Sequence, residues 1–316
     1  MPASSAAVVI NFNGGEDVPR CLAALLGQSV PVRVVLVDCG STDGTERVAQ
    51  APPAGVEGLP LGENRGYTGG ANAGLERLGG EAAVVGFFNP DCFPEPTFFS
   101  ECLEMLGDDP NVGGVAPRLV RPGGEVLDSC GQMLRPASLR VRDRGYGEPG
   151  AGRFPAQEPV LAACGAGMVY RVAALDAVRV AGKVFPPEFF AFWEDLDLGW
   201  RMWNAGWRVV YQPRAVAVHR RGGSAEPGGG RMILRRPPAV AAGIMLNRWA
   251  TWLRNLHTVD FLQRLPLLLA LDAAMVTWLL VRRPAVGPHL VRGLGRLALA
   301  CRQRRGLARR RLRELP

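Results

Sequence analysis

The chain has 316 residues, of which 47% are hydrophobic and 21% charged, a composition typical of globular proteins that excludes an intrinsically disordered chain. Its length predicts one large domain or two modest ones. The net charge of +8 is uneven: residues 231–316 contain 17 Arg or Lys and three Asp or Glu, whereas residues 1–230 contain 20 basic and 26 acidic residues. A basic tail on an acidic body indicates an anionic partner, either a membrane surface or nucleic acid.

The first ninety residues alternate between strand and helix patterns. Apolar runs predict buried strands at 6–12, 32–38, 56–62 and 82–89, and helices are expected at 17–26 and 67–78. Short links between them favour an α/β fold, with a mostly parallel sheet and helices on both of its faces. Ligands bind beyond the carboxyl ends of strands in such sheets, and Asp38, Asn64 and Asp91 fall at or just past three of these ends.

The middle of the chain changes character. Residues 118–159 are rich in Gly, Pro and Arg, which predicts a mobile loop or lid, and residues 160–171 return to a strand-and-turn pattern. Residues 185–219 combine an aromatic cluster, an amphipathic helix from about Glu194 and a strand. A glycine-rich linker then marks a boundary. We therefore expect a catalytic domain over 1–224 and a helical, basic region over 225–316.

The seven cysteines show no CxxC pair and no zinc-ligand spacing, so we interpret them as reduced thiols. The N-terminus lacks the positively charged start of a signal peptide and runs directly into a strand pattern. Both features favour a cytoplasmic location.

Two stretches have the chemistry of a nucleotide site. A carboxylate at the end of a buried strand, such as Asp38, can bind a base or ribose, although capping of the next helix is the alternative. Residues 63–75 contain four glycines between a strand and a helix, where backbone can approach a phosphate. That signal is weak alone, but Asn64, Arg65 and Asn72 add side-chain donors.

Two further stretches suggest a metal and a base. Asn89 and Asp91 lie two residues apart and project the same way, which suits a hard cation, although Asn-Pro-Asp is also common turn chemistry. His219 becomes a candidate ligand only if the fold brings it near Asp91. Glu194 and Asp195 begin a helix beside an aromatic cluster, which suits a general base, with capping again the alternative.

The same helix carries two patterns that predict structure. Its apolar stripe, which includes three tryptophans, predicts core packing. Asp197 and Arg201 are spaced i,i+4 and are expected to form a solvent-exposed pair.

Together these stretches resemble glycosyltransferase family 2 of the GT-A fold, especially its rhamnosyltransferase-like and galactofuranosyltransferase-like branch. The likeness extends from about Val8 to Ser224. It depends on seven motifs in order: VVINFNG, VDCGSTDGT, ENRGYTGGANAG, FNPDC, GAGMVYR, FWEDLDLGWRMWNAGW and VAVHRRGGS.

The resemblance implies an inverting transferase that moves a sugar from a nucleotide-diphosphate donor to a glycan or lipid-linked acceptor, in cell-surface polysaccharide or glycolipid synthesis. It implies Asp195 as catalytic base with Glu194 beside it, and Asp91 and His219 as ligands of Mg²⁺ or Mn²⁺. The implied donor site comprises Asn11, Asp38, Asn64, Arg65, Gly70, Asn72 and Asn89. Asn89 replaces the usual first Asp of the metal element, which predicts lower metal affinity and a partial metal requirement. Cys39 stands where Asn is usual, and nothing in the sequence explains it.

Other functions remain open at this point. A nucleotidyltransferase would share the strand–helix half, but the N-terminus lacks a basic glycine-rich signature for a nucleoside triphosphate. A non-catalytic adaptor acting through the basic tail would not need Asp91, Asp195 and His219.

The C-terminal region favours a membrane surface. Residues 265–281 are apolar but shorter than a typical span, and a basic amphipathic tail follows. We expect these helices to lie on the inner face of the cell membrane, with a soluble helical subdomain as the alternative. No nucleic-acid recognition motif accompanies the arginines.

Overall fold

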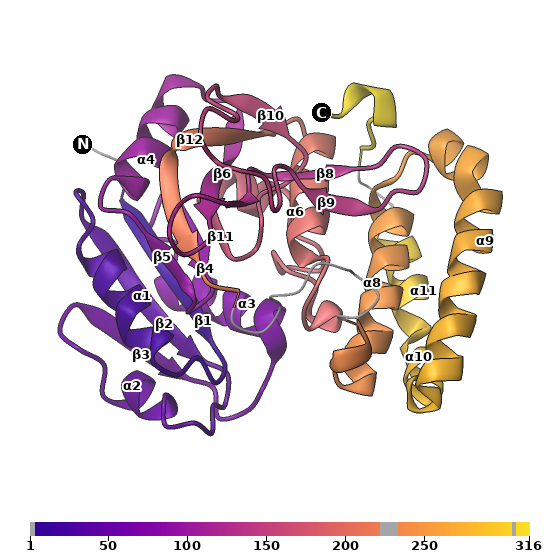
Figure 1. The fold of residues 1–316 in the computed structure, drawn as a ribbon, viewed down its shortest axis with the longest axis horizontal. Coiled ribbons are helices and arrows are strands. Elements are labelled where there is room, and N and C mark those ends of the chain that lie inside the picture. The colour runs from indigo at the N-terminus through magenta and orange to yellow at the C-terminus, as the bar shows by residue number, and fades with distance from the viewer. Residues whose placement is uncertain (1–3, 222–232, 305–307) are drawn as a thin grey trace.

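The computed structural model describes residues 4–221, 233–304 and 308–316. Among the described residues, a ten-stranded mixed sheet runs through the N-terminal part of the chain in the order β10-β12-β6-β11-β4-β1-β2-β3, with β5 on β12 and β7 on β6, and a helical region follows it (Figure 1). The strands are β1 (Ser5–Asn11), β2 (Val32–Asp38), β3 (Val56–Pro60), β4 (Val84–Phe88), β5 (Cys92–Pro94), β6 (Val112–Val120), β7 (Leu127–Ser129), β10 (Glu158–Val160), β11 (Gly167–Arg171) and β12 (Arg208–His219).

The predicted N-terminal half is confirmed. β1 lies between β2 and β4 and pairs in parallel with both, and β2 pairs in parallel with β3. Their carboxyl ends therefore share one edge of the sheet, as the site hypothesis requires. The antiparallel strand β11 then joins β4 to a second parallel pair, β6 and β12, so the sheet is mixed rather than uniformly parallel.

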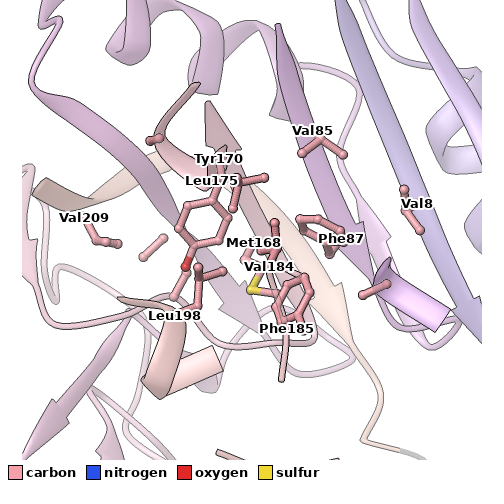
Figure 2. Close-up of a cluster of buried hydrophobic side chains, with 14 of the residues drawn as sticks. Val8, Val85, Phe87, Met168, Tyr170, Leu175, Val184, Phe185, Leu198 and Val209 are labelled. Atoms are coloured by element: carbon pink, nitrogen blue, oxygen red, sulfur yellow. The ribbon is translucent and has the colours of Figure 1, made fainter. Parts of the chain in front are cut away.

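Helices cover both faces of the sheet. The helices described in the N-terminal part of the chain are α1 (Asp17–Leu26), α2 (Glu46–Gln50), α3 (Gly66–Leu78), α4 (Phe98–Asp108), α5 (Val172–Ala177) and α6 (Glu194–Asn204). One core cluster joins the sheet to α1 and α4, and another joins it to α3, α5 and α6. Figure 2 shows part of the second cluster, in which Met168 lies beside Phe185 and the rings of Phe87 and Phe185 pack edge to face, 5.1 Å apart.

Glycines allow helix α3 to lie directly on the sheet. A Cβ at Gly74 would come within 2.3 Å of the Val8 side chain, and a Cβ at Gly70 within 2.7 Å of Ile10. These contacts give both glycines a packing role. Close contact between a helix and strands therefore accounts for Gly70 and Gly74 by itself, and a backbone approach to phosphate in residues 63–75 stays a prediction.

Residues 118–159, predicted to be a mobile loop or lid with only short strand-like pieces, do contain short strands, and these are packed on other elements. The segment contains β7 and a separate hairpin of β8 (Gln132–Leu134) and β9 (Val141–Asp143). The tip of the hairpin reaches the C-terminal helices, where Leu139 is fully buried in a cluster with Trp252 and Leu268 (Figure 1). Turn-forming residues set the short strand lengths here, but packing on distant helices orders the segment.

The C-terminal region is helical, as expected. It consists of α8 (Pro238–Asn255), α9 (Thr258–Arg282), α10 (Gly287–Gly293) and α11 (Gly295–Gln303), with short 3₁₀ turns at Pro284–Val286 and Leu312–Glu314. Another 3₁₀ turn, Pro187–Phe189, precedes α6. Helix α8 packs against α6 and against α10 and α11, so it connects the catalytic half to the rest.

The predicted exposure of the Asp197–Arg201 pair is wrong, because α8 covers that side of α6. Both side chains are fully buried, with Arg201 Nε 2.8 Å from Asp197 Oδ2. Arg254 Nη1 lies 2.6 Å from the other carboxylate oxygen, and Asn255 Nδ2 donates to it at 2.9 Å. Burial favours the neutral carboxyl, but the two arginines outweigh it and lower the pKa of Asp197.

Substitution of Gly74 by Ala should destabilise the protein. The new methyl would meet Val8 and Val37 inside the interface of α3 with the sheet. Overpacking of this kind costs about 1–3 kcal/mol, more than the gain of about 1 kcal/mol from the helix propensity of Ala.

Gly107→Ala is the matched control, since Gly107 lies in helix α4 with open space around its Cβ position. It should leave the free energy of unfolding unchanged or raise it by up to about 1 kcal/mol. Urea unfolding measures both variants. Equal effects of the two substitutions would contradict the packing role of Gly74.

Candidate functional site

The edge formed by β1 and β2 is built around the buried carboxylate of Asp38. Asp38 Oδ1 accepts hydrogen bonds from Asn11 Nδ2 at 2.8 Å and from Ser41 Oγ at 2.5 Å, and Oδ2 accepts from the backbone N–H groups of Gly40 and Ser41 at 3.1 Å. Asn11 Nδ2 also donates to Thr45 Oγ1, while its Oδ1 accepts from Gly14. Asn11 and Asp38 thus hold the turn after β2 in place. Asp38 does not cap the next helix, which begins at Glu46 with Thr45 as its N-cap and no side-chain cap bond. Direct contact of Asp38 with a nucleoside stays a prediction.

The other donor-site candidates differ in accessibility. Asn64 and Arg65 are exposed in the turn before α3, where Asn64 Oδ1 accepts from the N–H of Gly66. Asn72 is buried on the inner side of α3, and its amide bonds both to the N–H and to the carbonyl of Phe185, at 3.1 and 2.7 Å. A nucleotide contact by Asn72 would require those bonds to break. Asn64 and Arg65 need no such change.

The structure brings His219 to Asp91. Strand β5, which begins one residue after Asp91, pairs with the end of β12, so that Cys92 lies opposite His219. His219 Nε2 lies 3.4 Å from Asp91 Oδ1, and the Asp91 side chain keeps 16% of its surface exposed. His219 was a candidate metal ligand only if the fold brought it near Asp91, and the structure does so.

A third residue, Asp128 of β7, orients the imidazole. Its Oδ2 lies 2.7 Å from His219 Nδ1 and its Oδ1 is bonded to Arg221. With Asp128 on Nδ1, the other ring nitrogen, Nε2, faces Asp91, and the protonated ring donates to both carboxylates. Loss of the Nε2 proton would leave a lone pair there for a metal, the arrangement found behind many metal-bound histidines. Burial lowers the pKa of His219, but the hydrogen bonds to Asp128 and Asp91 outweigh it and raise the pKa to about 9.

The carboxylate of Asp195 is held at the start of helix α6. Its Oδ2 accepts from Gln132 Nε2 at 2.8 Å and from the N–H of Gly165 at 3.0 Å, and Oδ1 accepts from the N–H of Leu196 at 2.8 Å. Burial raises the pKa of Asp195, and these three hydrogen bonds only partly offset it. A base of this kind is more easily protonated than an exposed aspartate.

Glu194 is the more buried member of the pair. Its Oε2 has no hydrogen-bond partner among the described residues. Burial, and then the neighbouring charge of Asp195, raise the pKa of Glu194 well above its ordinary value. The two adjacent carboxyl groups are therefore differentiated, with Asp195 hydrogen-bonded as an anion and Glu194 favoured in its neutral form.

Two short segments connect Asp195 to the Asp91–His219 pair. In the loop before β11, Gly165 donates to Asp195, and the carbonyl of the next residue, Ala166, accepts from the N–H of Asn89 at 3.0 Å. In residues 127–132, Asp128 contacts His219 and Gln132 contacts Asp195. The residues that the sequence selected for a metal and for a base therefore belong to one site.

Helix α8 supports the segment that leads to the base. Phe190, Phe192 and Trp193 all have positive φ angles, of 61°, 70° and 74°, which are strained for aromatic residues. Asn247 Nδ2 donates to the carbonyls of Phe189, Ala191 and Phe192, at 2.8, 3.1 and 3.0 Å. A residue of the C-terminal region thus stabilises the strained turn directly before Glu194.

Sequence reasoning missed Asp128, Gln132 and Asn247. Each acts across more than fifty residues of chain, and the first two lie in the segment interpreted as a mobile loop. The polar residues of LDSCGQ, among short apolar pieces, were the only available signal.

Comparison with known proteins shows the family of the chain. Residues 6–178 match the family described as "Glycosyl transferase family 2". The N-acetylglucosaminyl-diphospho-decaprenol L-rhamnosyltransferase of Mycobacterium tuberculosis (strain CDC 1551 / Oshkosh) is 31% identical over 236 residues, which cover 68% of this chain and 75% of that protein.

Two solved structures show the fold. GalNAc-T7 with UDP, GalNAc and Mn²⁺ has a TM-score of 0.58 at 11% identity; the match covers 81% of this chain and 48% of that one, so this chain spans about half its length. The mannosyltransferase PcManGT from Pyrobaculum calidifontis, in complex with GDP-Man and Mn²⁺, has a TM-score of 0.55 at 19% identity, over 94% of this chain and 76% of that one.

Substitution of Glu194 by Gln should change how stability depends on pH. A carboxyl group whose pKa is raised in the folded state binds more protons there than in the unfolded state. The stability of the wild type therefore falls as pH rises from the unfolded pKa of about 4.3 towards the folded pKa. Gln cannot ionise and does not contribute this loss. The Tm of Glu194→Gln minus that of wild type should therefore increase with pH across this window.

Thermal unfolding across that pH range measures the effect. Glu95→Gln makes the same chemical change on an exposed loop residue and should follow the wild-type curve. A Tm difference between Glu194→Gln and wild type that stays constant with pH would show that burial does not perturb the Glu194 carboxyl.

Proposed function

Since this chain belongs to glycosyltransferase family 2 and is a glycosyltransferase that uses a nucleotide sugar, we propose that its acceptor is a hydroxyl of a glycan carried on a lipid diphosphate. The mycobacterial relative supports the proposal, because its name describes transfer of L-rhamnose to N-acetylglucosaminyl-diphospho-decaprenol. A deoxyhexose such as rhamnose is accordingly the first donor sugar to test. The pathway would be the synthesis of cell-surface polysaccharide or glycolipid.

The observation that carries the assignment is the convergence of Asp195 with Asp91 and His219. Asp195 accepts from Gln132 and from Gly165 in the loop before β11. The next residue of that loop, Ala166, accepts from Asn89, two residues before Asp91, which lies beside His219. Transfer with inversion needs a base on the acceptor side and charge stabilisation on the donor side. The site provides groups for both.

Asp195 is assigned as the general base. Its carboxylate takes the proton of the acceptor hydroxyl as the hydroxyl oxygen bonds to the anomeric carbon, while the bond to the nucleotide diphosphate breaks and its electron pair stays on the diphosphate. The raised pKa of Asp195 makes it a stronger proton acceptor than an ordinary aspartate, provided that it is ionised at the working pH. Glu194 is assigned as an orienting neighbour that contacts the acceptor.

We assign the nucleotide to the edge formed by β1, β2 and the start of α3. Asn64 and Arg65 are exposed there, and Asn11 and Asp38 shape the turn beside them. Asn89 lies between this edge and Asp91. Gly70 and Asn72 remain in the proposed donor site through their effect on where α3 lies.

Asp91 and His219 fit a divalent cation. Mg²⁺ and Mn²⁺ favour oxygen ligands, and Mn²⁺ also accepts an imidazole nitrogen, which Asp128 orients here. The described residues contain no group of three His, Cys, Asp or Glu arranged for a metal, so diphosphate oxygens of the donor would complete the shell. A bound cation would neutralise the charge that develops on the departing diphosphate.

The C-terminal helices are proposed to lie at the inner face of the cell membrane, as a region distinct from the catalytic domain. By length and composition, α9 is the described helix able to cross a membrane; it runs for 25 residues, with a mean hydropathy of 1.7 and 17% burial in its most apolar window. The helix continues through Pro266 and is longer than the apolar stretch read from the sequence. Asp272 does not face lipid, because it is buried against Arg248 and Trp249 of α8. One side of α9 therefore packs on protein and the other remains apolar and exposed.

Asp195→Asn tests the proposed base. The variant should lose at least about 10²-fold in turnover, because general bases contribute about 10²–10⁴-fold, while its affinity for the donor is kept. Glu194→Gln should lose less. Asp176→Asn, the same change on the exposed face of α5, should be fully active.

The measurement is transfer from dTDP-rhamnose, and from UDP- and GDP-sugars, to a lipid-diphosphate-linked N-acetylglucosamine. An Asp195→Asn enzyme with nearly full activity, or a product that keeps the anomeric configuration of the donor, would contradict the mechanism.

Asp91→Ala and Asp128→Asn test the proposed cation site. Asp91→Ala should abolish Mn²⁺ binding in the presence of a nucleoside diphosphate, because it removes a ligand. Asp128→Asn should weaken it about 10–100-fold, because it removes the group that orients His219.

Electron paramagnetic resonance of free Mn²⁺ measures binding directly, with Asp176→Asn as the control. Full activity of the wild-type enzyme in excess chelator would refute a metal requirement. Unchanged Mn²⁺ affinity in Asp128→Asn would refute the role of Asp128 alone.

A further inference from the structure

A pocket of about 220 Å³ lies among the C-terminal helices, outside the site described above. It is several times larger than the roughly 30 Å³ that one water occupies in the liquid, so a phosphate group fits. Its wall on α8 is apolar or small, whereas its wall on α10 and α11 is cationic. The lining residues are Ala239, Gly243, Leu246, His289, Arg292, Gly293 and Arg296.

Two glycines shape this pocket. A Cβ at Gly293 would come within 2.3 Å of Leu246, so α10 approaches α8 this closely only because position 293 has no side chain. A Cβ at Gly243 would lie 3.3 Å from Arg296 Nη1, so a larger side chain there would fill the space beside the guanidinium. Helical backbone at Gly243 tolerates other residues, which makes this position suitable for a steric test.

The positive charge of the pocket has little local compensation. In the part of the chain that the structure describes, no ion pair involves Arg292 or Arg296, and the acidic residues of α9 are paired elsewhere: Asp260 with Arg311 and Asp272 with Arg248. The carboxylate that acts on Arg296 is Glu188, which lies 3.3 Å from Arg254. Two guanidinium groups and an imidazole around a small cavity suit a phosphate group.

The surroundings favour a lipid over a soluble anion. Val291 and Leu294, on either side of Arg292 and Gly293, are 69% and 53% exposed. Large apolar residues of α9 are exposed as well: Leu262, Leu267, Leu269, Trp278 and Val281. The cationic pocket, with Val291 and Leu294 next to its lining residues, matches an amphiphile that has a phosphate head and a hydrocarbon chain, and the exposed apolar residues of α9 belong to the same helical region.

We propose that this pocket binds the phosphate group of a membrane lipid. The proposal deepens the proposed function and rests on it in one respect, the location at a membrane. The shared chemistry is a lipid-borne phosphate, which the acceptor's diphosphate or a bilayer phospholipid can supply. Arg296 also donates to Asn247 Oδ1 at 3.0 Å, and Asn247 holds the turn before Glu194, so an occupied pocket contacts the support of the catalytic helix.

Binding of the full chain to vesicles tests the proposal. The reference is phosphatidylcholine vesicles, in which choline neutralises the phosphate. The two anionic probes are the same vesicles with phosphatidylglycerol and the same vesicles with a polyprenyl diphosphate. Arg292→Gln and Arg296→Gln should each reduce binding to an anionic probe by about tenfold or more, as expected for hydrogen bonds to a charged group.

Two further variants separate pocket binding from general attraction. Gly243→Leu fills the pocket without changing charge and should lose about as much binding as Arg292→Gln. Arg302→Gln removes one exposed charge of α11 outside the pocket and should change binding less than about twofold. Equal losses in Arg302→Gln and Arg292→Gln, or full binding by Gly243→Leu, would overturn the proposal.

The source of the phosphate follows from the probes. If Arg292→Gln and Arg296→Gln lose tenfold in binding only to vesicles with the polyprenyl diphosphate, the phosphate belongs to the acceptor. If they lose as much with phosphatidylglycerol, it belongs to the bilayer lipids. Both results support the pocket. Hydrolysis of the nucleotide sugar by the same preparations reports on the catalytic site separately. A wild type that hydrolyses donor but binds all three vesicles equally refutes the pocket and leaves the glycosyltransferase assignment intact.

Discussion

Two hydrogen bonds from one short segment connect the two halves of the catalytic site. Asp128 orients His219 beside Asp91, and four residues later Gln132 holds the carboxylate of Asp195. Under the proposed mechanism, displacement of this segment would separate the proposed base from the proposed cation ligands. Turnover would then depend on this segment, although none of its residues has to touch the reacting atoms.

The catalytic helix depends equally on helix α8. Asp197, two residues after the base, is buried between Arg201 and Arg254, and Asn247 holds the strained turn that precedes Glu194. Removal of one partner from a buried charge network typically costs about 3–5 kcal/mol, because the remaining charge is left without compensation. The helices proposed to meet the membrane therefore also determine where the base lies.

Sequence reasoning succeeded where the interactions are local or periodic. The apolar runs of β1, β2 and β4 and the turn residues after them predicted the strands and the edge where Asp38 and Asp91 lie. It failed where a distant element determines the environment of a residue. Residues 118–159 look like a loop until α8 and α9 cover Leu139, and Asp197 looks like a surface residue until α8 covers α6. The glycines of α3 show a further reason why the sequence is ambiguous. Close packing of a helix on a sheet and a phosphate-binding loop both require glycine, so the sequence alone does not distinguish them.

The buried pairing of Asp272 with α8 has a geometric consequence. It fixes the rotation of α9 about its own axis, and with it the direction in which the exposed apolar side of that helix faces. If that side rests on a bilayer, the catalytic carboxylate stands at a set height above the lipid. Under the proposed function, the hydroxyl of a lipid-linked acceptor would have to reach that height, so the length of glycan between the lipid and the hydroxyl would matter even without a contact to each sugar.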